Sequence, residues 1–139
     1  MAADLERTVP GEIRELPGLL DAIAGFLREE GLRRDDITGV QIAVDEAFSN
    51  IVTHGYRGEG GTVTLRCRVS PGEAEIILVD HAPPFDPTTL PPPDLESDLA
   101  HRHPGGIGIS LIRNFMDGIS YEYRSGRNIL TLKKRVMTG

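Results

Sequence analysis

The sequence predicts a two-layer α/β sandwich, with helices packed on one face of a mixed, mainly antiparallel sheet. Apolar residues recur at helical spacing over residues 16–27 and again over 36–56. Apolar runs typical of strands occupy residues 62–69 and 73–80, and a glycine-rich turn opens a third helix before two final strands. Since a short extended segment also precedes the first helix, the predicted order is β-α-α-β-β-loop-α-β-β.

Length and composition favour one soluble globular domain. The 139 residues are 39% hydrophobic and 26% charged, which supplies enough apolar surface for a single core spanning residues 1–139. The formal net charge is −6 and the basic residues are scattered, which argues against direct nucleic-acid or membrane-surface partners. No segment has the apolar length needed to span a bilayer, and the single cysteine, Cys67, cannot form an internal disulfide. We therefore expect a cytoplasmic protein.

The helix boundaries are predicted from proline, aspartate and glycine. Pro17 suits the first turn of the helix over residues 16–27. Either Asp35 or Asp36 is expected to cap the second helix, because a short carboxylate side chain accepts hydrogen bonds from the free N–H groups there. Gly55 is expected to close the same helix.

The strands differ in their predicted exposure. Residues 62–69 alternate between apolar and polar side chains, which predicts a half-exposed strand. Residues 76–79 are all apolar, which predicts a central strand that is buried on both faces and ends at Asp80. Residues 125–127 are predicted to join the last two strands as a hairpin.

A long loop separates the two halves of the chain. Residues 83–104 are rich in proline and then polar, with little apolar periodicity. Loops of this length are uncommon in compact domains unless they act as lids or binding segments. The length of the loop therefore indicates a binding site beside it.

A carboxylate and a carboxamide share one face of the second predicted helix. Glu46 and Asn50 are four residues apart, so their side chains project about one turn from each other. A carboxylate base next to an oxygen ligand for a hard cation is the pairing that metal-assisted phosphoryl transfer requires. The same spacing is also typical of a solvated polar stripe, so the pair by itself leaves both interpretations open.

Two further motifs are compatible with a nucleotide. Asp80, at the end of its strand, can accept a hydrogen bond from a purine amino group, and it can equally serve as a turn residue. Residues 105–108, Gly-Gly-Ile-Gly, lack the Gly-Lys-Ser/Thr ending of a P-loop, which excludes a Walker-type site. Glycines before a helix nevertheless free backbone N–H groups to approach an anion, although a plain flexible turn has the same composition.

The order of these motifs resembles that of the GHKL ATPases, which have the histidine-kinase-like, or Bergerat, fold. The motifs are a helix with Glu-x-x-x-Asn, a strand ending in Asp, a Pro-Phe-Asp-Pro segment, a long loop and Gly-Gly-x-Gly. Within that family, DEAFSNIVTHGY, DHAPPFDP and GGIGISLIRNFMD are most similar to the anti-sigma-factor serine/threonine kinases of bacterial partner-switching systems. The likeness covers about residues 36–135.

The resemblance implies a role for each motif. Glu46 would be the general base, Asn50 would coordinate the Mg²⁺ that bridges the phosphates of ATP, and Asp80 would bind the adenine amino group. Residues 87–104 would form the lid over ATP. The other nucleotide-binding residues that it implies are Ala82, Phe85, Gly105, Gly106, Ile107, Gly108 and Thr131. Ala82 departs from the family, which often has glycine there, and would be strained if that position required a positive φ.

The same resemblance implies an activity and partners. The chain would be a serine/threonine protein kinase that phosphorylates an anti-sigma-factor antagonist, sequesters a sigma factor and forms a homodimer through its first strand and open sheet face. One alternative is a non-catalytic module that binds a partner according to bound ATP or ADP. Another is the catalytic domain of a histidine kinase acting in trans, which would need an acceptor histidine from another chain.

Overall fold

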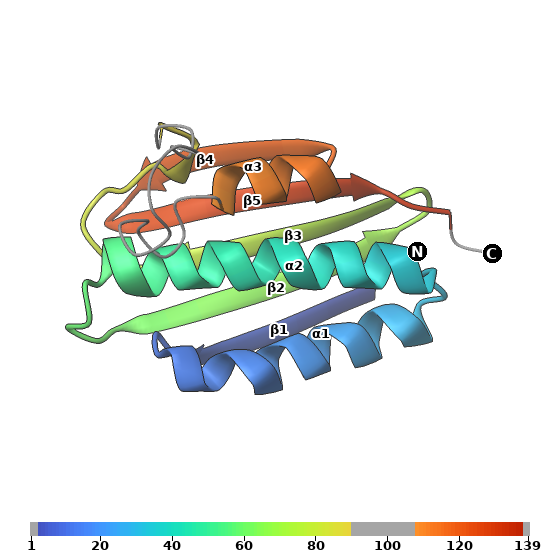
Figure 1. Cartoon of the computed structure of the whole chain (residues 1–139), viewed down its shortest axis with the longest axis horizontal. Helices are drawn as coiled ribbons and strands as arrows, with labels where there is room; N and C mark the ends of the chain where they lie inside the picture. Colours follow the sequence, from blue (N-terminus) through green and yellow to red (C-terminus); the bar gives the residue numbers. More distant parts are fainter. Residues whose placement is uncertain (1–2, 90–107, 138–139) are drawn as a thin grey trace, which may run out of the picture.

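The computed structural model describes residues 3–89 and 108–137, which form two layers (Figure 1). The strands are β1 (Ala3–Pro10), β2 (Thr62–Ser70), β3 (Glu73–Asp80), β4 (Gly118–Arg124) and β5 (Arg127–Arg135). The helices are α1 (Leu16–Glu29), α2 (Arg34–Asn50) and α3 (Gly108–Phe115), with the short turns η1 (Ile13–Glu15), η2 (Ile51–Gly55) and η3 (Pro87–Thr89). No helix in these described ranges is long and apolar enough to cross a bilayer.

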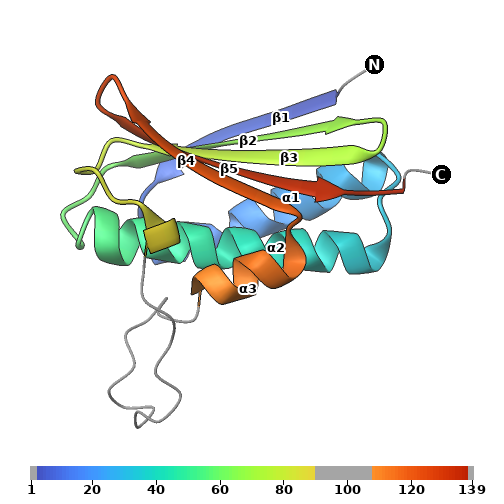
Figure 2. The same ribbon diagram turned by 90° about the horizontal axis from the view of Figure 1, so that it is seen from above.

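The strands form one sheet in the order β1-β2-β3-β5-β4. Viewed from the side, α1, α2 and α3 all lie on one face of it (Figure 2), which confirms the predicted two-layer sandwich. Every pairing between the described strands is antiparallel, so this part of the sheet is not mixed. The reason is that β5 returns between β3 and β4, so the crossover through α3 joins strands that are not neighbours.

The core lies between the sheet and the helices. Cys67, Ile76 and Leu132 stand side by side on three adjacent strands and are fully buried, as is Phe48 of α2. The alternation predicted for residues 62–69 is confirmed, since every second side chain of β2 is buried. Burial raises the pKa of the Cys67 thiol to about 12, so this thiol packs as an apolar group.

The central strand is exposed more than its sequence predicts. β3 does occupy the middle of the sheet, and Ile76 and Leu78 are fully buried beneath the helices. Ile77 and Val79 point the other way and are only partly buried, so the expected burial of both faces is wrong. The helices cover a single face, which leaves an apolar strip on the outer one.

The helix starts are partly as predicted. Pro17 lies at the first turn of α1. The residue at the N-cap of α2 is Arg33, which makes no side-chain capping bond, whereas Asp35 and Asp36 lie inside the first turn. The predicted aspartate cap is therefore wrong in position. Within that first turn, the two carboxylates still interact favourably with the positive end of the helix dipole.

The end of the second helix is a π turn. The N–H of Tyr56 donates to the carbonyl of Ile51 at 2.8 Å, and the wider turn ends at Gly55, the predicted last residue. Gly55 does not have the left-handed conformation of a helix-ending glycine. A Cβ atom there would lie 3.2 Å from the Cβ of Ala82, so glycine is needed for the close approach of this turn to the end of β3.

The predicted hairpin between the last two strands is confirmed, but its turn has two residues and not three, because Arg127 already begins β5. Ser125 and Gly126 have φ values of 55° and 77°, and the flanking residues Arg124 and Arg127 pair across the strands. Two consecutive positive φ angles match the twist of the adjoining strands, which fixes the register of β4 against β5.

Tyr56 fastens the ends of two strands together. Its hydroxyl donates to the carbonyl of Thr62 at 2.7 Å and accepts the N–H of His81 at 2.8 Å. The ring packs tightly against Gly11, and a Cβ atom at Gly61 would overlap it. Tyr56 thus holds the start of β2 and the end of β3 in place below η2.

The fit between Gly61 and Tyr56 predicts a large loss of stability for Gly61→Ala. The new methyl group would overlap the phenol ring, and φ at this position is 155°. We expect the free energy of unfolding to fall by about 2–4 kcal/mol in urea denaturation. Gly58→Ala is the matched control, because φ there is 78° but nothing lies within 4 Å, so it should cost only about 1–2 kcal/mol. Equal losses in the two variants would contradict the packing argument.

Candidate functional site

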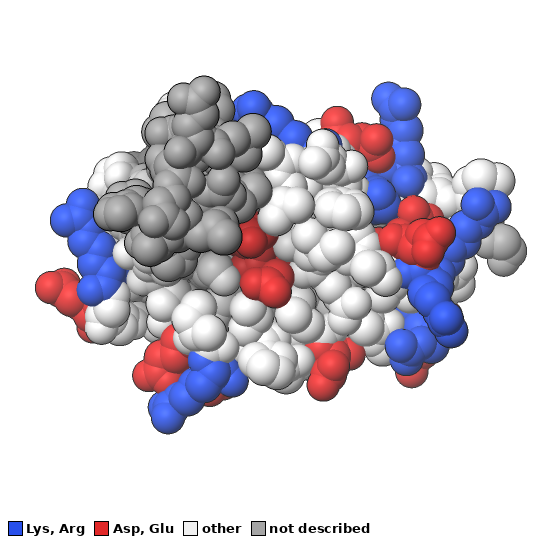
Figure 3. Space-filling model, in the orientation of Figure 1, with Lys and Arg blue, Asp and Glu red and all other residues white. Residues whose placement is uncertain are grey.

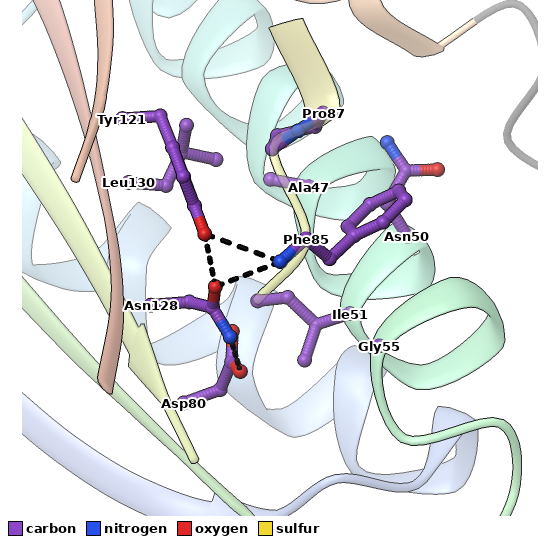
Figure 4. A pocket seen from close by; sticks show the side chains of 10 residues that line it. All are labelled: Ala47, Asn50, Ile51, Gly55, Asp80, Phe85, Pro87, Tyr121, Asn128 and Leu130. Atoms are coloured by element: carbon purple, nitrogen blue, oxygen red, sulfur yellow. Dashed lines mark hydrogen bonds between the residues drawn. The ribbon is translucent and has the colours of Figure 1, made fainter. Parts of the chain in front are cut away.

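The site lies where the end of the second helix meets the end of the central strand. A small cavity of about 20 Å³, which has room for about one water molecule, lies between them (Figure 4). Its lining comes from α2, η2, the end of β3 with the turn after it, and the β4–β5 hairpin. The lining residues are Ala47, Asn50, Ile51, Gly55, Asp80, Phe85, Pro87, Tyr121, Asn128 and Leu130.

The predicted pair on α2 is present, and its polar atoms are not satisfied. Asn50 is 1% exposed, and neither atom of its carboxamide has a hydrogen-bond partner in the described part of the chain. Glu46 is half-buried, and its buried Oε2 atom likewise has no partner there. Burial, and to a smaller extent the charge of Asp45, raises the pKa of Glu46. Buried polar atoms without partners are rare in native proteins, so these atoms require an explanation beyond packing.

Asp80 is also buried, but it is partly satisfied. Its Oδ1 atom accepts the N–H of Ala82 at 3.0 Å and the amide of Asn128 at 2.9 Å. Burial raises the pKa of Asp80, while these two hydrogen bonds oppose the rise. Ala82 is 2% exposed and has no positive φ, so the alanine found here in place of glycine is not strained.

Asn128 and Tyr121 complete this end of the site, and the sequence motifs did not include them. Asn128 is 4% exposed and faces Asp80 across the strand pair. Its amide also donates to the carbonyls of Ala82 and Pro83, at 3.0 and 3.2 Å. Its Oδ1 atom accepts the Tyr121 hydroxyl, which lies on β4. The signal that would have found Asn128 is strand alternation, which places it on the helical face of β5 with Leu130 and Leu132.

Phe85 lines both the small cavity and a second, larger hollow. Its ring stacks on His54, with 5.5 Å between ring centroids and 16° between planes. Its N–H lies 3.0 Å from Asn128 Oδ1 and 3.1 Å from the Tyr121 hydroxyl. On the other side of Phe85, the turn after η2 and residues 81–84 line the second hollow, of about 530 Å³.

Not every residue in the predicted set joins the site. Thr131 lies on the outer sheet face, paired with Ile77 and Ser120, because Leu130 and Leu132 face the helices. The side chain of Thr131 therefore points away from the cavity, on the opposite side of the sheet. Gly108 starts α3. Gly105, Gly106, Ile107 and lid residues 90–104 lie outside the described residues, and Pro87–Thr89 forms η3.

Among the described residues no group of three or more histidine, cysteine or acidic side chains could hold a metal ion. An acidic patch lies over α2 in a broad uncharged surface on the helical side of the molecule (Figure 3). The site thus combines a carboxylate with a raised pKa, a buried amide oxygen and a buried carboxylate at the opposite end.

Comparison with known proteins identifies the family. The family model described as a histidine kinase-like ATPase domain matches residues 9–134. The chain belongs to this family. The histidine kinase-like ATPase domain thus accounts for nearly all of the sequence, including every candidate site residue.

Relatives of this ATPase domain include two named protein kinases. A serine-protein kinase RsbW of Bacillus cereus (strain G9842) is 29% identical over 133 residues, which cover 93% of this chain and 83% of that protein. A serine/threonine-protein kinase BtrW of Bordetella bronchiseptica is 37% identical over 92 residues, which cover 66% of this chain and 65% of that protein. The crystal structure of the RsbU and RsbW domains of Rv1364c from Mycobacterium tuberculosis has the same fold, with a TM-score of 0.67 at 16% identity, and covers 96% of this chain and 32% of that one.

The raised pKa of Asp80 predicts a pH-dependent gain in stability for Asp80→Asn. The folded protein disfavours the charged carboxylate, so the wild type loses stability as the pH rises from the ordinary aspartate pKa through the raised one. The variant carries no such charge, so its advantage should be smallest in acid and grow towards neutral pH. Urea denaturation over a pH series measures this difference.

Asp4→Asn is the control for this pH series, because the pKa of Asp4 is shifted in the opposite direction from that of Asp80. The hydrogen bond and charge of Arg68 lower the pKa of Asp4, so the wild type gains stability as the pH rises above the ordinary value. Asp4→Asn should therefore be the less stable protein at neutral pH and match the wild type in acid. The same trend in both variants would contradict the assignment for Asp80.

Proposed function

We propose that this chain is a serine/threonine protein kinase that uses ATP and acts on an anti-sigma-factor antagonist, while also binding a sigma factor. The observation that carries the proposal is the pair on α2: a half-buried carboxylate with a raised pKa, one turn from a buried carboxamide whose atoms have no partner. Membership of an ATPase family and the names of the related kinases support it.

Asp80 and Asn50 would hold the two ends of the nucleotide. Asp80 offers a buried carboxylate oxygen to the amino group of adenine, beside the cavity lined by Ala47 and Leu130. The carboxamide oxygen of Asn50 is a hard ligand of the kind that Mg²⁺ takes, and its lack of a protein partner fits that role. When bound, Mg²⁺ neutralises charge on the phosphates of ATP. The family resemblance implies phosphate contacts for Gly105, Gly106 and Gly108, and α3 begins at Gly108.

Glu46 would act as the general base. As the substrate hydroxyl oxygen attacks the γ-phosphorus, the bond from phosphorus to the bridging oxygen of ADP breaks, and the hydroxyl proton passes to the Glu46 carboxylate. A general base works best when its pKa lies near the working pH, and burial raises the pKa of Glu46 in that direction. The uncharged surface that borders the acidic patch on the side away from the undescribed residues offers a protein substrate a neutral approach (Figure 3).

We also propose a cytoplasmic homodimer formed through β1 and the outer sheet face. That face carries an apolar strip that includes Val79, flanked by exposed cross-strand ion pairs. The Arg68 Nε lies 2.9 Å from Asp4 Oδ1, and an Arg66 guanidinium nitrogen lies 3.2 Å from Glu6 Oε1. Exposed pairs of this kind stabilise a monomer little, so they are free to rearrange against a second copy.

Glu46→Gln should remove phosphoryl transfer and leave nucleotide binding nearly intact. The amide keeps the shape of the side chain but cannot accept the proton, so the rate should fall about 10²–10⁴-fold. Incubation with labelled ATP, Mg²⁺ and the antagonist measures phosphoryl transfer, and calorimetry measures nucleotide binding. Asp21→Asn, on the exposed face of α1, is the control and should transfer normally. ATP binding by the wild type without any transfer would favour the non-catalytic binding module.

Asn50→Leu should stabilise the fold and abolish Mg²⁺-dependent ATP binding. Leucine has a similar volume and removes two buried polar atoms that lack protein partners, so the free energy of unfolding should rise by about 1–3 kcal/mol. ATP affinity should no longer differ with and without Mg²⁺. Asn114→Leu, at an exposed position of α3, should change neither the free energy of unfolding nor the effect of Mg²⁺ on ATP affinity. A loss of stability in Asn50→Leu would show that the carboxamide serves the fold and not a ligand.

A further inference from the structure

The turn after β3 cannot complete its own hydrogen bonds. Pro83 and Pro84 have no N–H groups, so the chain from Ala82 to Phe85 offers carbonyls with few local donors. Asn128 supplies what is missing: its amide donates to the carbonyls of Ala82 and Pro83, and its carbonyl accepts the N–H of Phe85. A single carboxamide on β5 therefore holds this turn against the sheet.

The carboxamide of Asn128 has only one orientation that fits its neighbours. Its Nδ2 side meets three acceptors, the two carbonyls and Asp80 Oδ1, while its Oδ1 side meets two donors, the N–H of Phe85 and the hydroxyl of Tyr121. Exchanging oxygen and nitrogen would place acceptors against acceptors and a donor against a donor. Figure 4 shows these groups converging beside the cavity.

The orientation of Asn128 in turn determines which Asp80 oxygen is free. Oδ1 is taken by the Asn128 amide at 2.9 Å and by the N–H of Ala82 at 3.0 Å. The described residues donate no hydrogen bond to Oδ2, and Asp80 lines the cavity. Oδ2 is then the atom available to a ligand, as an acceptor.

We propose that Asn128, held by Tyr121, is a positioning residue that fixes the Asp80 carboxylate and so makes the site prefer a purine with an amino group at C6. This inference rests on the proposed ATP site. A 6-amino base donates to Oδ2, whereas a 6-oxo base such as hypoxanthine presents an acceptor to it and is rejected. Tyr121 acts through Asn128, because its hydroxyl bonds to Asn128 Oδ1 and to the Phe85 N–H.

Asp80→Asn tests whether Ala82 and Asn128 fix the orientation of the side chain at position 80. Ala82 and Asn128 both donate towards Oδ1, so the new carboxamide should keep its oxygen there and turn its NH₂ group into the cavity. The cavity then presents a donor in place of an acceptor. The base preference should invert, from ATP towards inosine triphosphate (ITP).

The experiment measures dissociation constants for ATP and ITP by calorimetry with Mg²⁺. The wild type should prefer ATP by about 10- to 100-fold, and Asp80→Asn should prefer ITP. Adding Asn128→Ala should move both ratios about three- to tenfold towards one, in opposite directions. A residue that only supports the fold would weaken both nucleotides together and leave the ratios unchanged.

Two further variants keep the test decisive if Asn128→Ala does not fold. Tyr121→Phe removes one hydroxyl. Like Asn128→Ala, it should move the ATP-to-ITP preference of the wild type and that of Asp80→Asn towards one, each by at least about twofold. Tyr123→Phe is its control, because Tyr123 also lies on β4, is 44% exposed, and makes no hydrogen bond within the described chain; its ratios should equal those of the parent protein.

The outcomes separate the inference from the proposed function. If the folded wild type binds neither ATP nor ITP, both are overturned. If the wild type prefers ATP but the ratios do not change in Asn128→Ala and Tyr121→Phe, only the positioning role is overturned. An Asp80→Asn variant that still prefers ATP would also overturn the positioning role and leave the ATP site standing.

Discussion

The burial of the Asp80 carboxylate at the end of the central strand is the constraint around which the site is built. A buried carboxylate requires donors, and the described structure provides two, the Ala82 N–H and the Asn128 amide. Meeting that requirement folds the proline turn back onto β5 and places Phe85 over the cavity. The close approach of Gly55 to Ala82 and the hydroxyl of Tyr56 then hold η2 against the same strand end.

The two ends of the site are organised differently. At the Asp80 end, nearly every polar atom has a protein partner, which makes that end rigid before a ligand arrives. At the other end, Glu46 and Asn50 keep buried polar atoms without partners in the described chain, and this lowers the stability of the fold. This difference agrees with the proposed function, in which the Asp80 end would hold the base and the Glu46 and Asn50 end would meet the phosphates.

The sequence predicted the layers and the motif residues because both depend on local periodicity and spacing. The helix over 16–27, the alternation of β2 and the pair Glu46 and Asn50 needed no long-range information. What it did not reveal depends on which face of the sheet is covered and on strand register. Thr131 was included among the nucleotide-binding residues and Asn128 was passed over, although strand alternation places Asn128 on the helical face and Thr131 on the outer one.

The isolated thiol has an experimental consequence. Cys67 is the single cysteine in the sequence, is completely shielded by the helices, and has a pKa of about 12 while the fold is intact. A thiol reagent can modify it only when the middle of the sheet opens, so the rate of labelling reports how often that opening occurs. A ligand that stabilises the junction of α2 and β3 would lower the labelling rate of Cys67. The natural cysteine thus reports binding without any added dye.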